Sequence, residues 1–172
     1  MPTFLLVLAL LVPTTSAFPP SATGPETARH QPVDRFVWPL APPHPVVRPF
    51  RPPTTPYGPG HRGVDLAGRP GDPVSAAGDG VVVYAGQLAG RSLVSISHAN
   101  GLRTTYEPLT PAVSVGARVR GGTVIGHLAA GHVGCEDAPA CLHWGARRGD
   151  EYLDPLGLLS SGRVRLLPWD GG

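Results

Sequence analysis

Residues 81–106, VVVYAGQLAGRSLVSISHANGLRTTY, determine the fold class that the sequence predicts. Three short runs within this stretch (81–86, 92–97 and 102–106) are rich in the β-branched and aromatic residues that strands favour. Asn100-Gly101 joins the second run to the third, and this dipeptide is a strong signal for a type I′ hairpin turn. The stretch therefore predicts short strands joined by tight turns.

The residues on the C-terminal side continue this pattern. From Val113 to Leu128, small glycine turns alternate with β-branched residues, and LHWGAR (142–147) predicts a further strand. No window shows a sustained helical period. We therefore predict an all-β domain over residues 58–159 with no substantial helix.

Composition changes sharply near residue 57. Before it Pro is frequent and Gly24 is the only Gly, whereas Gly is abundant after it. Residues 18–57 are interpreted as a Pro-rich leader and arm: 18–34 have the composition of a disordered segment, and the more apolar 35–57 predict an extended arm across the domain surface. Residues 160–172 are assigned to a C-terminal tail.

The first 17 residues, MPTFLLVLALLVPTTSA, have the form of a signal peptide with an A-x-A-like cleavage site. The run is short for a bilayer span and no second apolar stretch follows it. It lacks the usual positive n-region, so a buried N-terminal strand or helix is the alternative. We predict a secreted, extracytoplasmic protein of the cell wall, with no membrane span in the mature chain.

Export changes the interpretation of Cys135 and Cys141, which share the short loop GCEDAPAC (134–141). Two cysteines in an oxidising compartment usually pair, so we predict a disulfide between them. A pair of zinc thiolates is the alternative, although C-x5-C is not a usual zinc spacing. Two free thiols are the third alternative.

The formal net charge of +2 does not imply nucleic acid or a membrane surface as a partner. All fourteen basic residues are Arg, and the sequence contains no Lys. This absence matters because residues 71–83 and 115–126 look like parts of a biotinyl or lipoyl carrier domain. Such carriers attach their cofactor to a lysine, so the sequence excludes that class.

His61 and Asp65 are candidate metal ligands because a spacing of four places both side chains on one face of a strand. Imidazole and carboxylate are both good ligands for Zn²⁺. His143 could complete a site of two His and one Asp with an open fourth position, which is the pattern of a catalytic zinc. The alternatives are a hydrogen-bonded His–Asp pair and a core histidine beside Trp144.

The order of these features resembles the M23 family of LytM-type zinc metallopeptidases over about residues 58–157. The resemblance rests on five features in sequence: H-x3-D (61–65), GDPVSAAGDGVVVYAG (71–86), ISHANGLRTTYEPL (96–109), the V-x-x-G rhythm and LHWGARR (142–148). It implies an antiparallel β-sandwich with long loops and a zinc groove. It further implies Zn²⁺ bound by His61, Asp65 and His143, and peptidoglycan peptides as substrates.

Two positions depart from the family pattern. The family has a catalytic His two residues before its last ligand, where this chain has Cys141. It has another in a Y-x-H-L strand, where this chain has Pro108. Positioned acid–base groups contribute typically ~10²–10⁴-fold to rate, so activity at the family's level would require substitutes.

Two residues are candidate catalytic substitutes. Glu107 precedes Pro108, but strand alternation places it on the face opposite Tyr106 unless the proline distorts the strand. His132 lies in the loop AAGHVGC (129–135), which the predicted disulfide would tie to the strand edge beside the metal. A solvated carboxylate and an exposed loop histidine are the respective alternatives.

Two functions remain open at this level. The first is an exported zinc endopeptidase that cuts peptidoglycan peptides, and the second is a catalytically inactive LytM-type domain that binds cell-wall peptide or regulates a peptidoglycan hydrolase. We expect a monomer in either case. Arg147 and Arg148 extend the LHWG strand and could meet substrate carboxylates, with a solvated strand end as the alternative.

Overall fold

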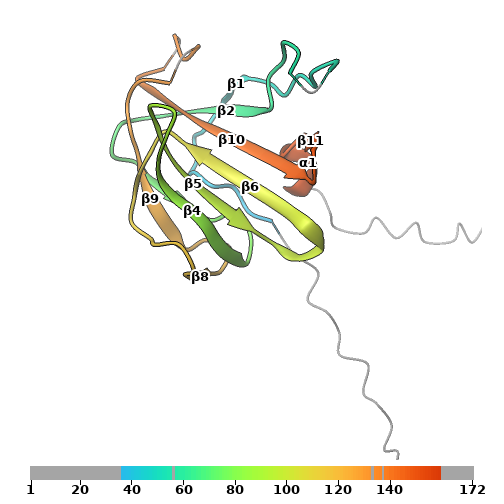
Figure 1. The fold of residues 1–172 in the computed structure, drawn as a ribbon. Helices are drawn as coiled ribbons and strands as arrows, with labels where there is room; N and C mark the ends of the chain where they lie inside the picture. Colours follow the sequence, from blue (N-terminus) through green and yellow to red (C-terminus); the bar gives the residue numbers. More distant parts are fainter. Residues whose placement is uncertain (1–35, 56, 133, 137, 160–172) are drawn as a thin grey trace, which may run out of the picture. The chain divides into compact units, whose positions relative to one another are not determined.

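The computed structural model describes residues 36–159 except 56, 133 and 137 (Figure 1). All of these belong to one compact unit, Pro32–Gly172. The predicted signal peptide, most of the predicted leader and the predicted tail lie outside the described residues. Within the described part of the chain, no helix is long and apolar enough to cross a membrane.

Two antiparallel sheets make up the domain (Figure 1). The larger sheet has the strand order β1-β2-β10-β6-β5-β4-β8, with β11 paired to β10. Its strands are β1 (Val46–Arg48), β2 (Gly63–Gly68), β4 (Gly80–Leu88), β5 (Arg91–Ser97), β6 (Leu102–Glu107), β8 (Arg118–Val119), β10 (Ala140–Arg148) and β11 (Glu151–Leu153). The smaller sheet has the order β3-β9-β7, from β3 (Pro73–Ser75), β9 (Val124–Leu128) and β7 (Leu109–Pro111).

Helical structure is confined, in the described residues, to a 3₁₀ turn (η1, Ala99–Gly101) and one short helix (α1, Leu156–Leu159). The prediction of an all-β antiparallel fold is therefore confirmed. Its physical basis is visible at the predicted hairpin between β5 and β6. Asn100 and Gly101 both have positive φ (56° and 70°), and the N–H of Leu102 donates to the carbonyl of Ala99, as a type I′ turn requires.

One hydrophobic core lies between the two sheets. Leu66 of β2 and Trp144 of β10 are fully buried with Val74 of β3 and Ile125 of β9. Burying a large apolar side chain contributes roughly 1.5–3 kcal/mol. Because side chains alternate along a strand, the residues between these core positions, His143 among them, point to the other face of the larger sheet.

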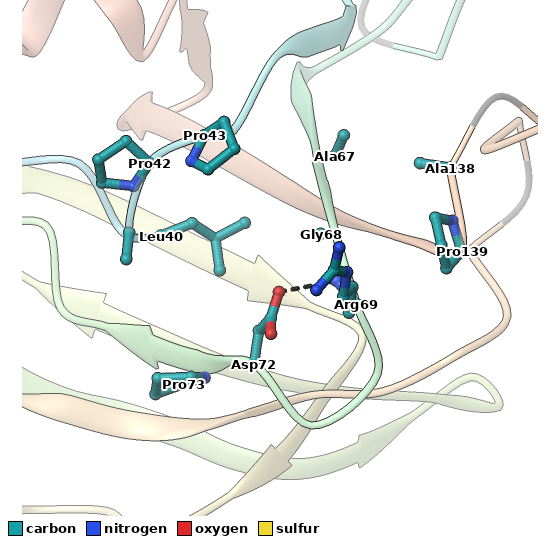
Figure 2. A pocket seen from close by; sticks show the side chains of 11 residues that line it. Leu40, Pro42, Pro43, Ala67, Gly68, Arg69, Asp72, Pro73, Ala138 and Pro139 are labelled. Carbon is teal, nitrogen blue, oxygen red and sulfur yellow. Dashed lines mark hydrogen bonds between the residues drawn. The ribbon is translucent and has the colours of Figure 1, made fainter.

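The Pro-rich segment before residue 57 packs against the domain where it is described. Phe36 and Leu40 are buried in the core, and β1 adds a strand to the edge of β2. A hollow of about 500 Å³ separates this segment from the turn after β2 (Figure 2). In that turn the N–H of Arg69 donates to Oδ2 of Asp72 at 2.8 Å. None of the predicted site residues lines this hollow.

Candidate metal centre

Tertiary structure brings together the three predicted metal ligands. Asp65 on β2 and His143 on β10 are direct neighbours in the antiparallel register. His61 precedes β2 and is held by two backbone hydrogen bonds with Arg51, of 2.7 and 3.0 Å. One potential ligand atom from each of the three residues lies within 4.8 Å of the others.

Both histidines of this cluster contact the same carboxylate oxygen. Oδ1 of Asp65 lies 3.0 Å from Nε2 of His61 and 2.8 Å from Nδ1 of His143. The two imidazole nitrogens are themselves 3.0 Å apart. His61 and Asp65 are buried, whereas the side chain of His143 is 14% exposed, so solvent reaches the cluster from one side.

A backbone carbonyl sets the tautomer of His61. Its Nδ1 lies 2.8 Å from the carbonyl oxygen of Pro49, which can only accept a hydrogen bond. Nδ1 therefore carries the proton in the neutral ring and Nε2 carries the lone pair. Burial lowers the pKa of His61 in spite of the opposing effects of Pro49 and Asp65, so the ring is neutral at neutral pH.

The charge state of Asp65 follows from its neighbours. Burial raises the pKa of this carboxyl, but hydrogen bonds and attraction from His132 and His143 outweigh burial and hold the pKa well below its usual range. Asp65 is therefore an anion in a buried position. Its second oxygen, Oδ2, is also buried and has no hydrogen-bond partner among the described residues.

These observations fit a bound divalent cation. A lone pair on Nε2 of His61 facing a carboxylate oxygen at 3.0 Å is unfavourable unless a positive charge lies between them. A buried carboxylate oxygen without a hydrogen-bond partner also destabilises the folded state, and a bound cation would reduce that cost. Two imidazoles and one carboxylate with an accessible fourth side form the ligand set of a catalytic zinc.

His132 also reaches the cluster. Its Nε2 lies 3.2 Å from Oδ1 of Asp65, and its ring centroid is 5.5 Å from that of His143. The side chain is only 14% exposed, so it is not an exposed loop residue. The predicted disulfide between Cys135 and Cys141 is present and connects the loop of His132 to β10.

Glu107 lies on the same face as the candidate ligands. It pairs directly with His143 in the register of β6 and β10. Alternation does place it opposite Tyr106, as predicted, but Tyr106 points into the core and the cluster lies on the other face. Facing away from Tyr106 therefore brings the Glu107 side chain towards the candidate ligands and not away from them. Its Oε1 accepts a hydrogen bond of 2.8 Å from Arg91.

The two replaced family positions offer no proton-transfer group. Cys141 is fully buried and oxidised in the disulfide. Pro108 lines a small hollow of about 150 Å³ beside Glu107 and His132, and its carbonyl accepts a hydrogen bond from the N–H of Ala129. Any acid–base group near the candidate ligands must therefore come from other residues.

A hollow of about 270 Å³ opens over the cluster. It is lined by Arg48, His61, Arg62, Arg91, Glu107, His132 and His143. The sequence did not identify the three arginines or the carbonyl of Pro49 as parts of this site. These residues have no local motif, and only the pairing of distant segments brings them here.

Comparison with known proteins decides the family. The model of Peptidase family M23 matches residues 59–155, which is more than half of the chain. This chain belongs to Peptidase family M23. Members of the family are typically zinc-dependent, and they act on peptidoglycan mostly outside the cytoplasm.

Individual relatives agree with this assignment. An uncharacterized protein of Mycobacterium tuberculosis is 57% identical over 143 residues, which are 81% of this chain and 57% of that protein. The M23 chain thus spans little more than half the length of this relative. The DD-carboxypeptidase/endopeptidase Mpg of Neisseria meningitidis is 38% identical over 97 residues, covering 56% of this chain and 22% of Mpg.

A solved structure supports the fold. Csd3 of Helicobacter pylori superposes with a TM-score of 0.62 at 25% identity, over 78% of this chain and 37% of Csd3. The arrangement of antiparallel sheets is therefore that of other M23 proteins.

Proposed function

We propose that this chain is an exported zinc peptidase that hydrolyses peptide bonds in cell-wall peptidoglycan, with His132 as the proton-transfer group. The observation that carries the proposal is the approach of His132 to the three-ligand cluster, 3.2 Å from the carboxylate of Asp65. This approach supports the proposal because it brings an imidazole to the three candidate ligands, in a chain whose family histidines are replaced at residues 108 and 141. Export rests on the signal-like first 17 residues.

In this mechanism His61, Asp65 and His143 would hold a zinc ion, which would supply Lewis acidity to activate water and polarise the substrate carbonyl. The carbonyl of Pro49 keeps Nε2 of His61 free of a proton. His132 takes a proton from the attacking water and delivers it to the leaving amine, because an imidazole can do both near neutral pH. Glu107 is the second candidate, but its carboxylate is already engaged in an ion pair of 2.8 Å with Arg91.

A specific observation also favours the inactive alternative. His132 lies beside the same carboxylate oxygen as both candidate histidine ligands, so it could become a fourth ligand. Four protein ligands close a zinc site and are typical of structural zinc. In that case the domain would bind cell-wall peptide or regulate a peptidoglycan hydrolase without cutting.

The deciding experiment combines metal analysis with digestion of peptidoglycan by the purified protein. For His132→Ala we expect unchanged zinc content and a loss of roughly 10²–10⁴-fold in peptide release. The matched control is His127→Ala, which removes an exposed histidine and should change neither. If zinc-loaded wild type releases no peptides over long incubation, the inactive alternative holds. If His132→Ala also weakens zinc binding, His132 is a ligand.

A further inference from the structure

Positive charge gathers on the open face of the larger sheet, beginning beside the candidate metal centre. Arg103 on β6 and Arg147 on β10 are direct cross-strand neighbours. Arg62 lies in the same region, with its guanidinium 5.3 Å from the ring centroid of Tyr152. These three arginines, here called the arginine row, line a hollow of about 270 Å³ that also includes Glu107 and His143.

The pairing of Arg103 with Arg147 is unfavourable for the isolated protein. Like charges directly opposite each other across two strands destabilise a sheet. Arg147 donates to the carbonyl of Gly149 at 2.7 Å, but that contact does not neutralise its charge. Among the described residues, no carboxylate forms an ion pair with either arginine. An anionic ligand would remove this repulsion.

The position of the arginine row suggests what kind of anion it binds. Arg147 is four residues from His143 on β10, which corresponds to about 13 Å along a strand. An extended peptide covers that distance with about four residues. The hollow joins the two places, so one peptide can reach both.

We propose that the arginine row binds a side-chain or terminal carboxylate of an anionic peptide, about four residues from the bond held at the metal centre. Guanidinium groups recognise carboxylates through paired hydrogen bonds, which a neutral amide cannot reproduce. Only the position of the reacting bond rests on the proposed peptidase function. Recognition of the carboxylate does not depend on zinc.

The first test measures binding without catalysis. A fluorescein-labelled, C-terminally amidated oligoalanine hexapeptide with one Glu is compared with its amidated Gln counterpart by anisotropy, using chelator-treated protein. We expect the Glu peptide to bind about tenfold more tightly, with a preference that shrinks between about 0.05 and 0.5 M NaCl. Equal affinity for the two peptides, including no detectable binding of either, would overturn the proposal.

Substitutions test whether Arg103 and Arg147 produce the preference for the Glu peptide. We expect Arg103→Gln and Arg147→Gln each to weaken binding of the Glu peptide roughly three- to tenfold, and the double variant to abolish the preference. Arg118→Gln makes the same charge change at an exposed residue of β8, at the far edge of the sheet, and should have no effect. Melting temperatures of the single variants should not fall, because each relieves repulsion. A preference that survives in the double variant contradicts the assignment.

A second series tests the spacing. Oligoalanine peptides with a C-terminal hydroxamate, a metal-binding group, carry one Glu two, four or six residues from it and are titrated into zinc-loaded protein. We expect the strongest dependence on Arg103 and Arg147 for the spacing of four. If hydroxamates fail to bind while the first test succeeds, the metal proposal fails and the carboxylate subsite stands. If binding of all three peptides depends equally on Arg103 and Arg147, the proposed spacing of about four residues is wrong.

Discussion

His61 illustrates how one backbone group can prepare a side chain for metal binding. Its Nδ1 donates to the carbonyl of Pro49, twelve residues earlier in the chain, and its Nε2 therefore faces Asp65 without a proton. Partners of this kind fix the orientation and tautomer of histidine ligands and raise their basicity. A metal bound here would therefore be influenced by a group beyond the three candidate ligands.

At this scale we predict that His61→Ala and His143→Ala abolish stoichiometric zinc binding. Each removes one of three ligands and leaves Asp65 as an uncompensated buried anion. Metal content after dialysis is the measurement, and His127→Ala is the control because His127 is exposed. Zinc retained at wild-type stoichiometry in both ligand variants would contradict the metal centre.

Among the elements, β6 serves both faces of the larger sheet. Glu107 lines the hollow over the metal cluster, whereas Thr104 and Tyr106 point into the core and belong to a buried chain of hydrogen-bonded polar groups. Oη of Tyr106 accepts from the N–H of Ala77 at 2.8 Å and lies 2.9 Å from Oγ1 of Thr104, which in turn lies 2.7 Å from Nε2 of His98. Burial raises the pKa of Tyr106 to about 12, so its hydroxyl stays protonated.

We predict that Tyr106→Phe lowers the free energy of unfolding by about 1–3 kcal/mol, because it leaves buried polar groups without a partner. Urea unfolding of the metal-free protein measures the change. Tyr84→Phe also removes a hydroxyl that donates to a backbone carbonyl, that of Gln87, but at an exposed position. That control should change stability by less than about 0.5 kcal/mol. Equal changes in the free energy of unfolding in the two variants would mean that the buried hydrogen-bonded chain contributes no more to stability than an exposed hydrogen bond.

A disulfide between Cys135 and Cys141 cross-links the loop between β9 and β10. Replacing Cys135 and Cys141 together by Ser should cost about 2–3 kcal/mol, because a short closed loop loses its cross-link. If His132 transfers protons, peptide release should fall with zinc content unchanged. Reducing agent should affect wild type in the same way, and should not lower the residual activity of His132→Ala. A double serine variant with full activity would show that the loop holds His132 in place without the disulfide.

For the molecule as a whole, the cluster joins segments that are otherwise far apart in the chain. The residue after β1, the segment before β2, β2 itself, β10 and the loop before β10 all contribute to it. A metal bound here would therefore stabilise the folded state and not the unfolded one. Free zinc at 100 times its dissociation constant should add about 2.7 kcal/mol.

We accordingly predict that zinc raises the melting temperature in a concentration-dependent way and that a chelator reverses the rise. The melting temperature of His61→Ala should be the same with zinc and with chelator. Differential scanning calorimetry with and without chelator checks this. A zinc effect of wild-type size in His61→Ala would place the bound metal elsewhere in the protein.

Much of the fold could be read from the sequence because its determinants are local. β-branched runs favour strands, and Asn100-Gly101 favours the observed turn, whatever the rest of the chain does. The spacing of four residues between His61 and Asp65 is also local, but by itself it is a weak signal, and the family resemblance made these residues candidate ligands. His143 required the family resemblance, because a single histidine on a strand carries little information.

Other features were decided only by tertiary structure. Alternation predicted that Glu107 and Tyr106 would face opposite ways, but the packing of the smaller sheet determined that the Tyr106 face became the core. The carbonyl of Pro49 and the arginine row likewise reached the groove through strand pairing between distant segments. The sequence by itself therefore determined the strands and the turn, which depend on short-range chemistry, and it named the candidate ligands through the family pattern. Tertiary packing decided which face bears the site and which charges surround it, because register and burial depend on the whole chain.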